Sequence, residues 1–188
     1  MSTLELILLA VALAMDCFTM SLVSGVIVRR FHWGLILRMG ILFGVFQAMM
    51  PFLGWLGVNF FSSQLETIGH WIAFALLVFI GGRMIKESFE EEPQFNPLAL
   101  QTLLLLSVAT SIDALAVGVS FACIGYTKLG MLVMPLFVIG IASLLFSVLG
   151  NVLGVKFGNG IAKRVKPEFF GGIVLILIGI RILLTHII

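Results

Sequence analysis

Charged residues are scarce in this sequence. Lys, Arg, Asp and Glu make up 11% of the 188 residues, whereas hydrophobic residues make up 61%. Soluble domains contain roughly 25% charged and about 45–50% apolar residues, so the composition excludes a soluble globular protein and indicates an integral membrane protein. The net charge is only +2, and the basic residues form no single patch. We therefore expect a lipid bilayer as the surroundings and no nucleic-acid partner.

Cysteine and histidine are also rare. The two cysteines, Cys17 and Cys123, lie in apolar runs without CxxC spacing, so we expect buried thiols. The three histidines, His32, His70 and His186, lie near the ends of apolar segments and leave none for a site inside the membrane. The N-terminal region lacks the basic stretch of a signal peptide, and its apolar run is too long for one. We expect it to remain as a helix of the mature protein.

Long apolar runs fill most of the chain. They predict an all-α integral membrane protein, because about 20 apolar residues cross the hydrocarbon core of a bilayer. Six transmembrane helices are expected at about 4–28, 35–60, 68–86, 98–124, 130–155 and 168–186. The length of the chain suggests a single membrane domain, residues 1–188.

Basic residues are unequally distributed between the two predicted sides of the membrane. With six spans, the first, third and fifth connections share one side, which carries Arg29, Arg30, Arg38, Arg83, Lys86, Lys156, Lys163, Arg164 and Lys166. The other side carries only Lys128 and Arg181. Because cytoplasmic loops are enriched in Lys and Arg, we expect a multi-pass protein of the inner membrane with both termini on the extracytoplasmic side.

Several sequence features recur at an interval of about 97 residues. Asp113 follows Asp16 by 97 positions. Two glycine patterns recur at similar intervals, Gly57-Val58-Asn59-Phe60 with Gly154-Val155-Lys156-Phe157, and Gly81-Gly82-Arg83 with Gly179-Ile180-Arg181. These matches predict two repeats, at about 1–92 and 97–188. Each repeat has three spans, an odd number, so the second would be inverted relative to the first, as in many transporters.

The two aspartates lie deep in apolar runs. Asp113 is the only charged residue between Pro93 and Thr127, and Asp16 lies within the first predicted span. A charge at the centre of a transmembrane helix costs roughly 2.5–3.5 kcal/mol on insertion scales, so such residues mark functional sites by default. The alternative is a structural aspartate held by a neighbouring helix. Because the aspartates occur in matching places, we expect one shared site at the midplane.

Neutral oxygen donors accompany the aspartates. They are Gln47, Thr110, Ser143, Ser147 and Asn151. Pro51 cannot donate the hydrogen bond that the carbonyl of Gln47 would accept, so Gln47 suits a polar cavity, with an ordinary proline kink as the alternative. Ser143, Ser147 and Asn151 lie in the fifth expected span and recur every four positions. They serve either as further ligands or as small residues at a helix contact.

The expected ligand set combines two carboxylates with neutral oxygens. It suits a hard divalent cation such as Mn²⁺, Mg²⁺ or Ca²⁺ and argues against zinc or copper. Two negative charges match one divalent ion, and a proton on one aspartate could replace the ion when it leaves. We expect no catalytic residue and no cofactor. The expected metal-binding residues are Asp16, Gln47, Thr110, Asp113, Ser143, Ser147 and Asn151.

Motifs in both halves of the chain resemble those of the bacterial manganese efflux pump family. They are Met15–Phe18 with Ser21 and Gly25, Phe43–Gln47 with Pro51 and Gly54-Trp55, Gly69–Phe74 with Gly81–Ile85, and Ala109–Gly118. That family is similar to the lysine-exporter superfamily of six-helix exporters. The resemblance implies secondary export of Mn²⁺ across the inner membrane, with Asp16 and Asp113 as the functional carboxylates. Some family members carry glutamate where this chain has Gln47.

Two other functions compete with manganese export. An exporter of another solute, such as cadmium or an amino acid, is the first, and Cys17 beside Asp16 would suit cadmium. An intramembrane aspartyl protease is the second, because such enzymes also use two membrane aspartates. Their motif is Gly-x-Gly-Asp, which neither Ser111-Ile112-Asp113 nor Ala14-Met15-Asp16 matches. We therefore expect a transporter and not an enzyme.

Overall fold

The computed structural model describes residues 2–59, 69–87, 89, 96–157 and 167–187. Within these ranges the chain is helical and contains no strand, which confirms the expected all-α class. Every expected apolar segment corresponds to a helix, and the ends agree within a few residues; positions 60 and 68 lie outside the described residues. The helices are α1 (Thr3–Val28), α2 (Trp33–Asn59), α3 (Gly69–Glu87), α4 (Leu100–Cys123), α5 (Leu129–Phe157) and α7 (Pro167–Ile187).

Local sequence signals set the ends of α1. Ser2 caps its N-terminus, because the Ser2 hydroxyl accepts a bond from the Glu5 amide at 3.3 Å and the Glu5 carboxylate accepts one from the Ser2 amide at 2.7 Å. This reciprocal pair satisfies two amides that have no partner inside the helix. At the other end Arg29 adopts a left-handed conformation, φ 53°, and donates to the carbonyl of Gly25. The helix therefore stops where the basic stretch begins.

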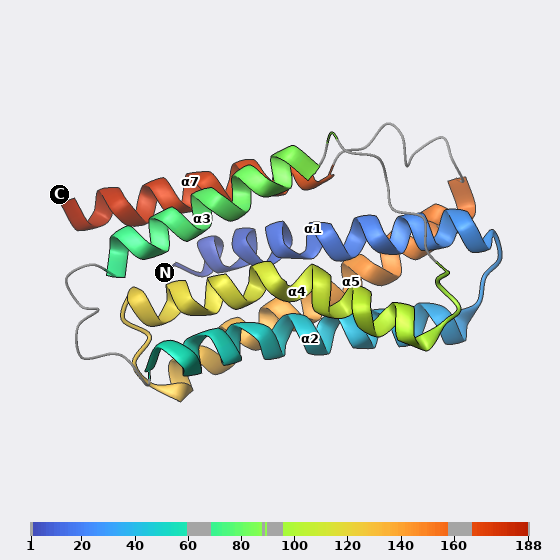
Figure 1. Ribbon diagram of the computed structural model, residues 1–188, viewed down its shortest axis with the longest axis horizontal. Helices are drawn as coiled ribbons and strands as arrows, with labels where there is room; N and C mark the ends of the chain where they lie inside the picture. Colours follow the sequence, from blue (N-terminus) through green and yellow to red (C-terminus); the bar gives the residue numbers. More distant parts are fainter. Residues whose placement is uncertain (1, 60–68, 88, 90–95, 158–166, 188) are drawn as a thin grey trace.

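The helices form a bundle in two parts (Figure 1). α1 packs on α5 and α2 packs on α4, while α2 and α5 also contact each other. α3 and α7 form a separate pair that lies against one side of this group, with α3 on α4 and α7 on α1. Successive helices run in opposite directions, so α1 begins and α7 ends toward the same end of the bundle. The α3–α7 pair covers only part of the length of α1 and α4.

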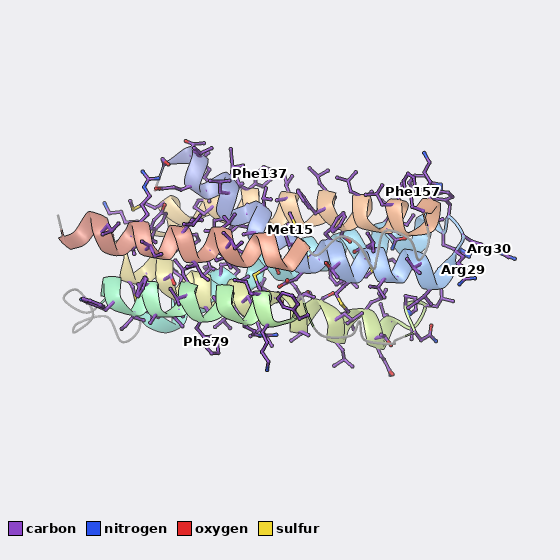
Figure 2. All side chains as sticks on the ribbon, turned by 90° about the horizontal axis from the view of Figure 1, so that it is seen from above. Met15, Arg29, Arg30, Phe79, Phe137 and Phe157 are labelled. Atoms are coloured by element: carbon purple, nitrogen blue, oxygen red, sulfur yellow. The ribbon has the colours of Figure 1, made fainter. Side chains whose placement is uncertain are left out.

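Large apolar side chains lie on the outside of the bundle. On α5 they recur every four residues, at Leu129, Val133, Phe137, Ile141, Leu145 and Leu149, and α2 carries a similar exposed stripe. Figure 2 shows Phe79 and Phe137 projecting from the bundle. α1, α2, α4 and α5 are long and apolar enough to cross a membrane, and α7 contains a shorter apolar stretch, Gly172–Ile182. Soluble monomers rarely expose apolar stripes of this length, so these side chains indicate contact with lipid.

Glycines bring the helix backbones into direct contact. Gly150 of α5 lies against the carbonyl of Phe18 in α1, and Gly54 of α2 lies against that of Leu115 in α4. In the α2–α5 contact, a Cβ atom on Gly44 would lie 2.9 Å from the Gly140 carbonyl oxygen, and one on Gly140 would lie 3.1 Å from that of Gly44. Small residues allow this approach, which membrane helices use to gain van der Waals contact.

Two of the basic residues counted for this asymmetry form ion pairs inside helices. Arg83, which the sequence assigned to the third connection, lies within α3, and Arg181 lies within α7, inside the sixth expected span; their side chains pair with Asp113 and Glu5. Removing them from the comparison leaves eight basic residues against one, with the asymmetry intact. Three of the eight, Lys163, Arg164 and Lys166, lie outside the described residues. Figure 2 shows Arg29 and Arg30 at one end of the bundle.

Candidate substrate site

Asp113 is a buried carboxylate in the middle of α4. Its side chain is 6% exposed, and its Oδ1 atom lies 3.2 Å from Nη1 of Arg83 on α3. The arginine side chain is 39% exposed. Burying an unpaired charge is strongly unfavourable, and a guanidinium that donates to the carboxylate offsets much of that cost. The structure therefore supplies Asp113 with a cation of its own.

Asp16 lies next to a junction of three helices. Its neighbour Cys17 is fully buried, and the Cys17 thiol lies beside the hydroxyls of Thr110 on α4 and Ser143 on α5. Asp16 is itself partly buried and interacts with its surroundings. Because Cys17 and Thr110 are neighbours, α1 and α4 meet at the level of the two aspartates.

The two aspartates lie at similar depths in the bundle. α1 and α4 are in contact and run in opposite directions (Figure 1). Asp16 precedes Cys17 by one residue, and Asp113 follows Thr110 by three, which is less than one turn at 3.6 residues per turn. Antiparallel helices in register at Cys17 and Thr110 therefore place both carboxylates within about one helical turn of each other along the axis.

Among the described residues, four buried side-chain oxygens have no hydrogen-bond partner, on Thr19, Ser24, Gln47 and Ser143, and the last two belong to predicted ligands. Gln47 is fully buried, and its Nε2 donates to the carbonyl of Leu13 at 3.0 Å, while its Oε1 accepts no bond. The hydroxyl of Ser143 is also buried; the Cys17 thiol lies beside it, but no group lies in the geometry of a hydrogen bond to it. Buried polar atoms are nearly always satisfied, so two open oxygens from facing helices indicate a place that a ligand would complete.

The other predicted ligands have partners. Thr110 donates to the carbonyl of Leu106 in its own helix at 2.9 Å. Ser147 shares a 2.6 Å bond with Ser21 of α1, and the Asn151 amide lies 3.7 Å from the sulfur of Met39. Ser147 and Asn151 are therefore engaged in helix contacts, one and two turns beyond Ser143 on α5. A hydroxyl oxygen still has a second lone pair, so these bonds leave acceptor capacity at Thr110 and Ser147.

Arg83 is the important residue that the sequence reasoning assigned to the wrong place. It was counted among the basic residues of a connection, although the expected third span, 68–86, already included it. An arginine followed by two more apolar residues, Met84 and Ile85, is a sign of a residue inside the helix rather than beyond it. Only the tertiary contact between α3 and α4 shows that Asp113 is its partner.

The site has few strong metal ligands. Among the residues that the structure describes, no group of three or more His, Cys, Asp or Glu side chains could hold a metal ion. A carboxylate, an amide oxygen and hydroxyls are hard ligands and favour hard cations. Such a set binds an ion less tightly than a closed structural site does, which is compatible with release.

Comparison with known proteins gives one consistent result. Residues 30–183 match the Mntp family, which is described as "Putative manganese efflux pump". A protein of the same description from Bacteroides fragilis is 52% identical over 190 residues, which cover all of this chain and 98% of that protein. Its counterparts in Bacteroides thetaiotaomicron and Methanosarcina mazei are 46% and 44% identical.

These matches extend over nearly the full length of each chain. The alignment covers all of this chain for the Bacteroides thetaiotaomicron protein and 99% of it for the Methanosarcina mazei protein, with 98% of each relative. No solved structure matches the chain. The family is one of transporters, which agrees with the expectation of a protein that is not an enzyme and disagrees with an aspartyl protease. The chain belongs to the Mntp family of efflux pumps.

Proposed function

We propose that this protein is a secondary transporter that exports Mn²⁺ from the cytoplasm across the inner membrane, with Asp16 and Asp113 as joint ligands of the ion. Manganese is the substrate in the description of the family and in the names of the relatives. The observation that carries the mechanism is the buried carboxylate of Asp113, placed beside the junction where Cys17, Thr110 and Ser143 meet.

Charge balance supports a divalent substrate. A dehydrated divalent ion in a medium of low dielectric needs compensating negative charge nearby, and two carboxylates supply it. The open oxygens of Gln47 and Ser143 provide neutral ligands without additional charge. In this proposal Thr110 completes the central ligand set, and Ser147 and Asn151 extend the polar face along α5.

An inverted repeat would place the site on its pseudo-two-fold axis. Gly44 and Gly140 are 96 residues apart in sequence, and their backbones contact each other, as two equivalent residues beside such an axis must. The α1–α5 contact at Gly150 and the α2–α4 contact at Gly54 form a second related pair. These contacts support division of the single domain into halves of about 1–92 and 97–188, and Gln47 and Ser143 then occupy equivalent places.

The orientation follows from the basic residues. The end of the bundle that carries Arg29 and Arg30 faces the cytoplasm in this proposal, and both termini are extracytoplasmic. A single cysteine at position 160 tests it, in a variant with Cys17 and Cys123 replaced. In intact cells a membrane-impermeant thiol reagent should not label position 160. Labelling there without disruption of the membrane would contradict the orientation.

Asp16→Asn and Asp113→Asn test the shared site. Each variant removes one negative charge with little change in size, so the remaining carboxylate cannot balance a divalent ion. Both should lose manganese tolerance in cells and Mn²⁺ uptake into inverted vesicles, with normal amounts of protein in the membrane. Retention of transport by either variant would show that the two aspartates are not joint ligands.

The competing interpretation is export of an ion that prefers thiolate ligands, such as cadmium, because Cys17 is next to Asp16. Cys17→Ser distinguishes the two substrates, since it removes the soft ligand and keeps a small polar side chain. We expect Mn²⁺ uptake by this variant to match that of the wild type. Loss of Mn²⁺ uptake by this variant would favour the soft ion. In the wild type, the same conclusion would follow if Cd²⁺ protected Cys17 from an alkylating reagent and Mn²⁺ did not.

A further inference from the structure

The Arg83–Asp113 ion pair has a consequence for the charge of the site. The two carboxylates together carry two negative charges, and the guanidinium of Arg83 carries one positive charge that is permanent at any physiological pH. With the arginine in place, a divalent ion would leave a net positive charge in a medium of low dielectric. With the arginine displaced, the same ion is exactly balanced by Asp16 and Asp113.

We propose that Arg83 is a tethered cation that competes with the transported ion for Asp113. This inference rests on the proposed function, because it assumes that Asp113 is a ligand of the substrate. In the substrate-free protein the guanidinium holds the carboxylate, which lowers the cost of burying it. The entering ion displaces the guanidinium, and the return of Arg83 to Asp113 favours release of the ion.

The structure gives Arg83 a way to leave. Its side chain is 39% exposed, whereas that of Asp113 is 6% exposed, so the arginine approaches from the periphery of the bundle. Its Nη1 atom lies 3.2 Å from Oδ1 of Asp113, which is longer than the roughly 2.7–2.9 Å typical of a strong charge-assisted hydrogen bond. A long flexible side chain with an exposed stem can move outward without unfolding α3.

The second repeat offers a contrast. Arg181 occupies the position 98 residues after Arg83, but it pairs with Glu5 in the first turn of α1. Glu5 precedes Asp16 by eleven residues, which is about 16 Å along a helix. The repeat-related arginines therefore contact acidic residues at different depths. Arg83 is therefore the arginine that contacts a predicted ligand of the ion, Asp113.

Arg83→Gln tests the competition directly. Equilibrium binding of Mn²⁺ to the purified full-length protein should become about tenfold tighter, because the ion no longer displaces a guanidinium. Mn²⁺ uptake into inverted vesicles should slow, because release is no longer assisted. If the wild type binds Mn²⁺ and Arg83→Gln binds it no more tightly, the competition is refuted and the proposed function stands. If the wild type binds no Mn²⁺, both are refuted.

Arg83→Lys provides a second measurement that does not depend on the stability of the glutamine variant, because it retains the charge. The lysine amine should react slowly with an acylating reagent while it is held by Asp113, and faster when Mn²⁺ displaces it. Peptide mass spectrometry reads the modification at position 83 separately from that at Lys86. We expect Mn²⁺ to raise the rate severalfold, and to have no effect in Arg83→Lys with Asp113→Asn. An unchanged rate with Asp113 present would overturn the proposal.

Discussion

Gly118 of α4 packs its backbone directly against the carbonyl of Pro51 in α2. A Cβ atom at Gly118 would approach that oxygen closer than 3.0 Å, a distance that real Cβ atoms essentially never show. Pro51 follows Gln47 by one turn, and Gly118 lies five residues after Asp113. The contact therefore fixes the distance between the helix that carries Gln47 and the helix that carries Asp113.

Gly118→Ala should destabilise the protein by about 1–3 kcal/mol, because the added methyl group forces α2 and α4 apart. The matched control is Gly57→Ala in α2, where nothing lies within 4 Å of the added atom. In a helix that change is neutral or stabilising by up to about 1 kcal/mol. Thermal melting of both variants in detergent checks the difference. Equal melting temperatures would mean that α2 and α4 separate without cost.

Gln47 offers a test of what its amide group does. Gln47→Leu removes both the open Oε1 and the bond from Nε2 to Leu13, whereas Gln47→Glu removes that donor but keeps the oxygen. If Oε1 is a ligand, the leucine variant should bind Mn²⁺ about tenfold more weakly or worse, and the glutamate variant should retain binding. Equal loss in both would assign the role of Gln47 to its bond with Leu13.

Ser21 and Ser143 should respond to alanine substitution in opposite ways. Ser21→Ala breaks the buried bond to Ser147 and should cost about 0.6 kcal/mol of stability, the average for hydrogen bonds between membrane helices, without loss of transport. Ser143→Ala removes a hydroxyl that has no partner, so stability should hold or rise while transport falls. Melting temperatures and vesicle uptake, measured together, check both. Normal uptake by Ser143→Ala would remove that residue from the ligand set.

Tyr126, in the connection between α4 and α5, should titrate above the usual range of a phenol. Burial raises the pKa of Tyr126, and the negative charge of Glu5 raises it further, because both disfavour the phenolate. Since the chain contains a single tyrosine, phenolate absorbance reports on this residue alone. Glu5→Gln should lower the pKa of Tyr126 toward its ordinary value and leave the part due to burial. An unchanged titration would show that Glu5 does not face Tyr126.

The sequence was sufficient to predict the elements of the fold. Apolar runs of the length of a bilayer predicted each of the helices that the structure describes, because in lipid a backbone must satisfy its own hydrogen bonds and a helix is the simplest way to do so. The same reasoning identified Asp16 and Asp113, because a charge within such a run is conspicuous. It also indicated Gln47 and Ser143, and the structure shows that these two have open oxygens.

Other features were decided only by the tertiary structure. Sequence alone could not distinguish Ser143, whose hydroxyl is open, from Ser147, whose hydroxyl bonds Ser21, because both lie on one face of α5. It could not show that Arg83 pairs with Asp113, since ion pairs between helices depend on which helices touch and at what height. Periodicity along one helix determines which side chains share a face. The partner of each face is set by packing between helices, and here the contacts of glycine with backbone carbonyls determine it.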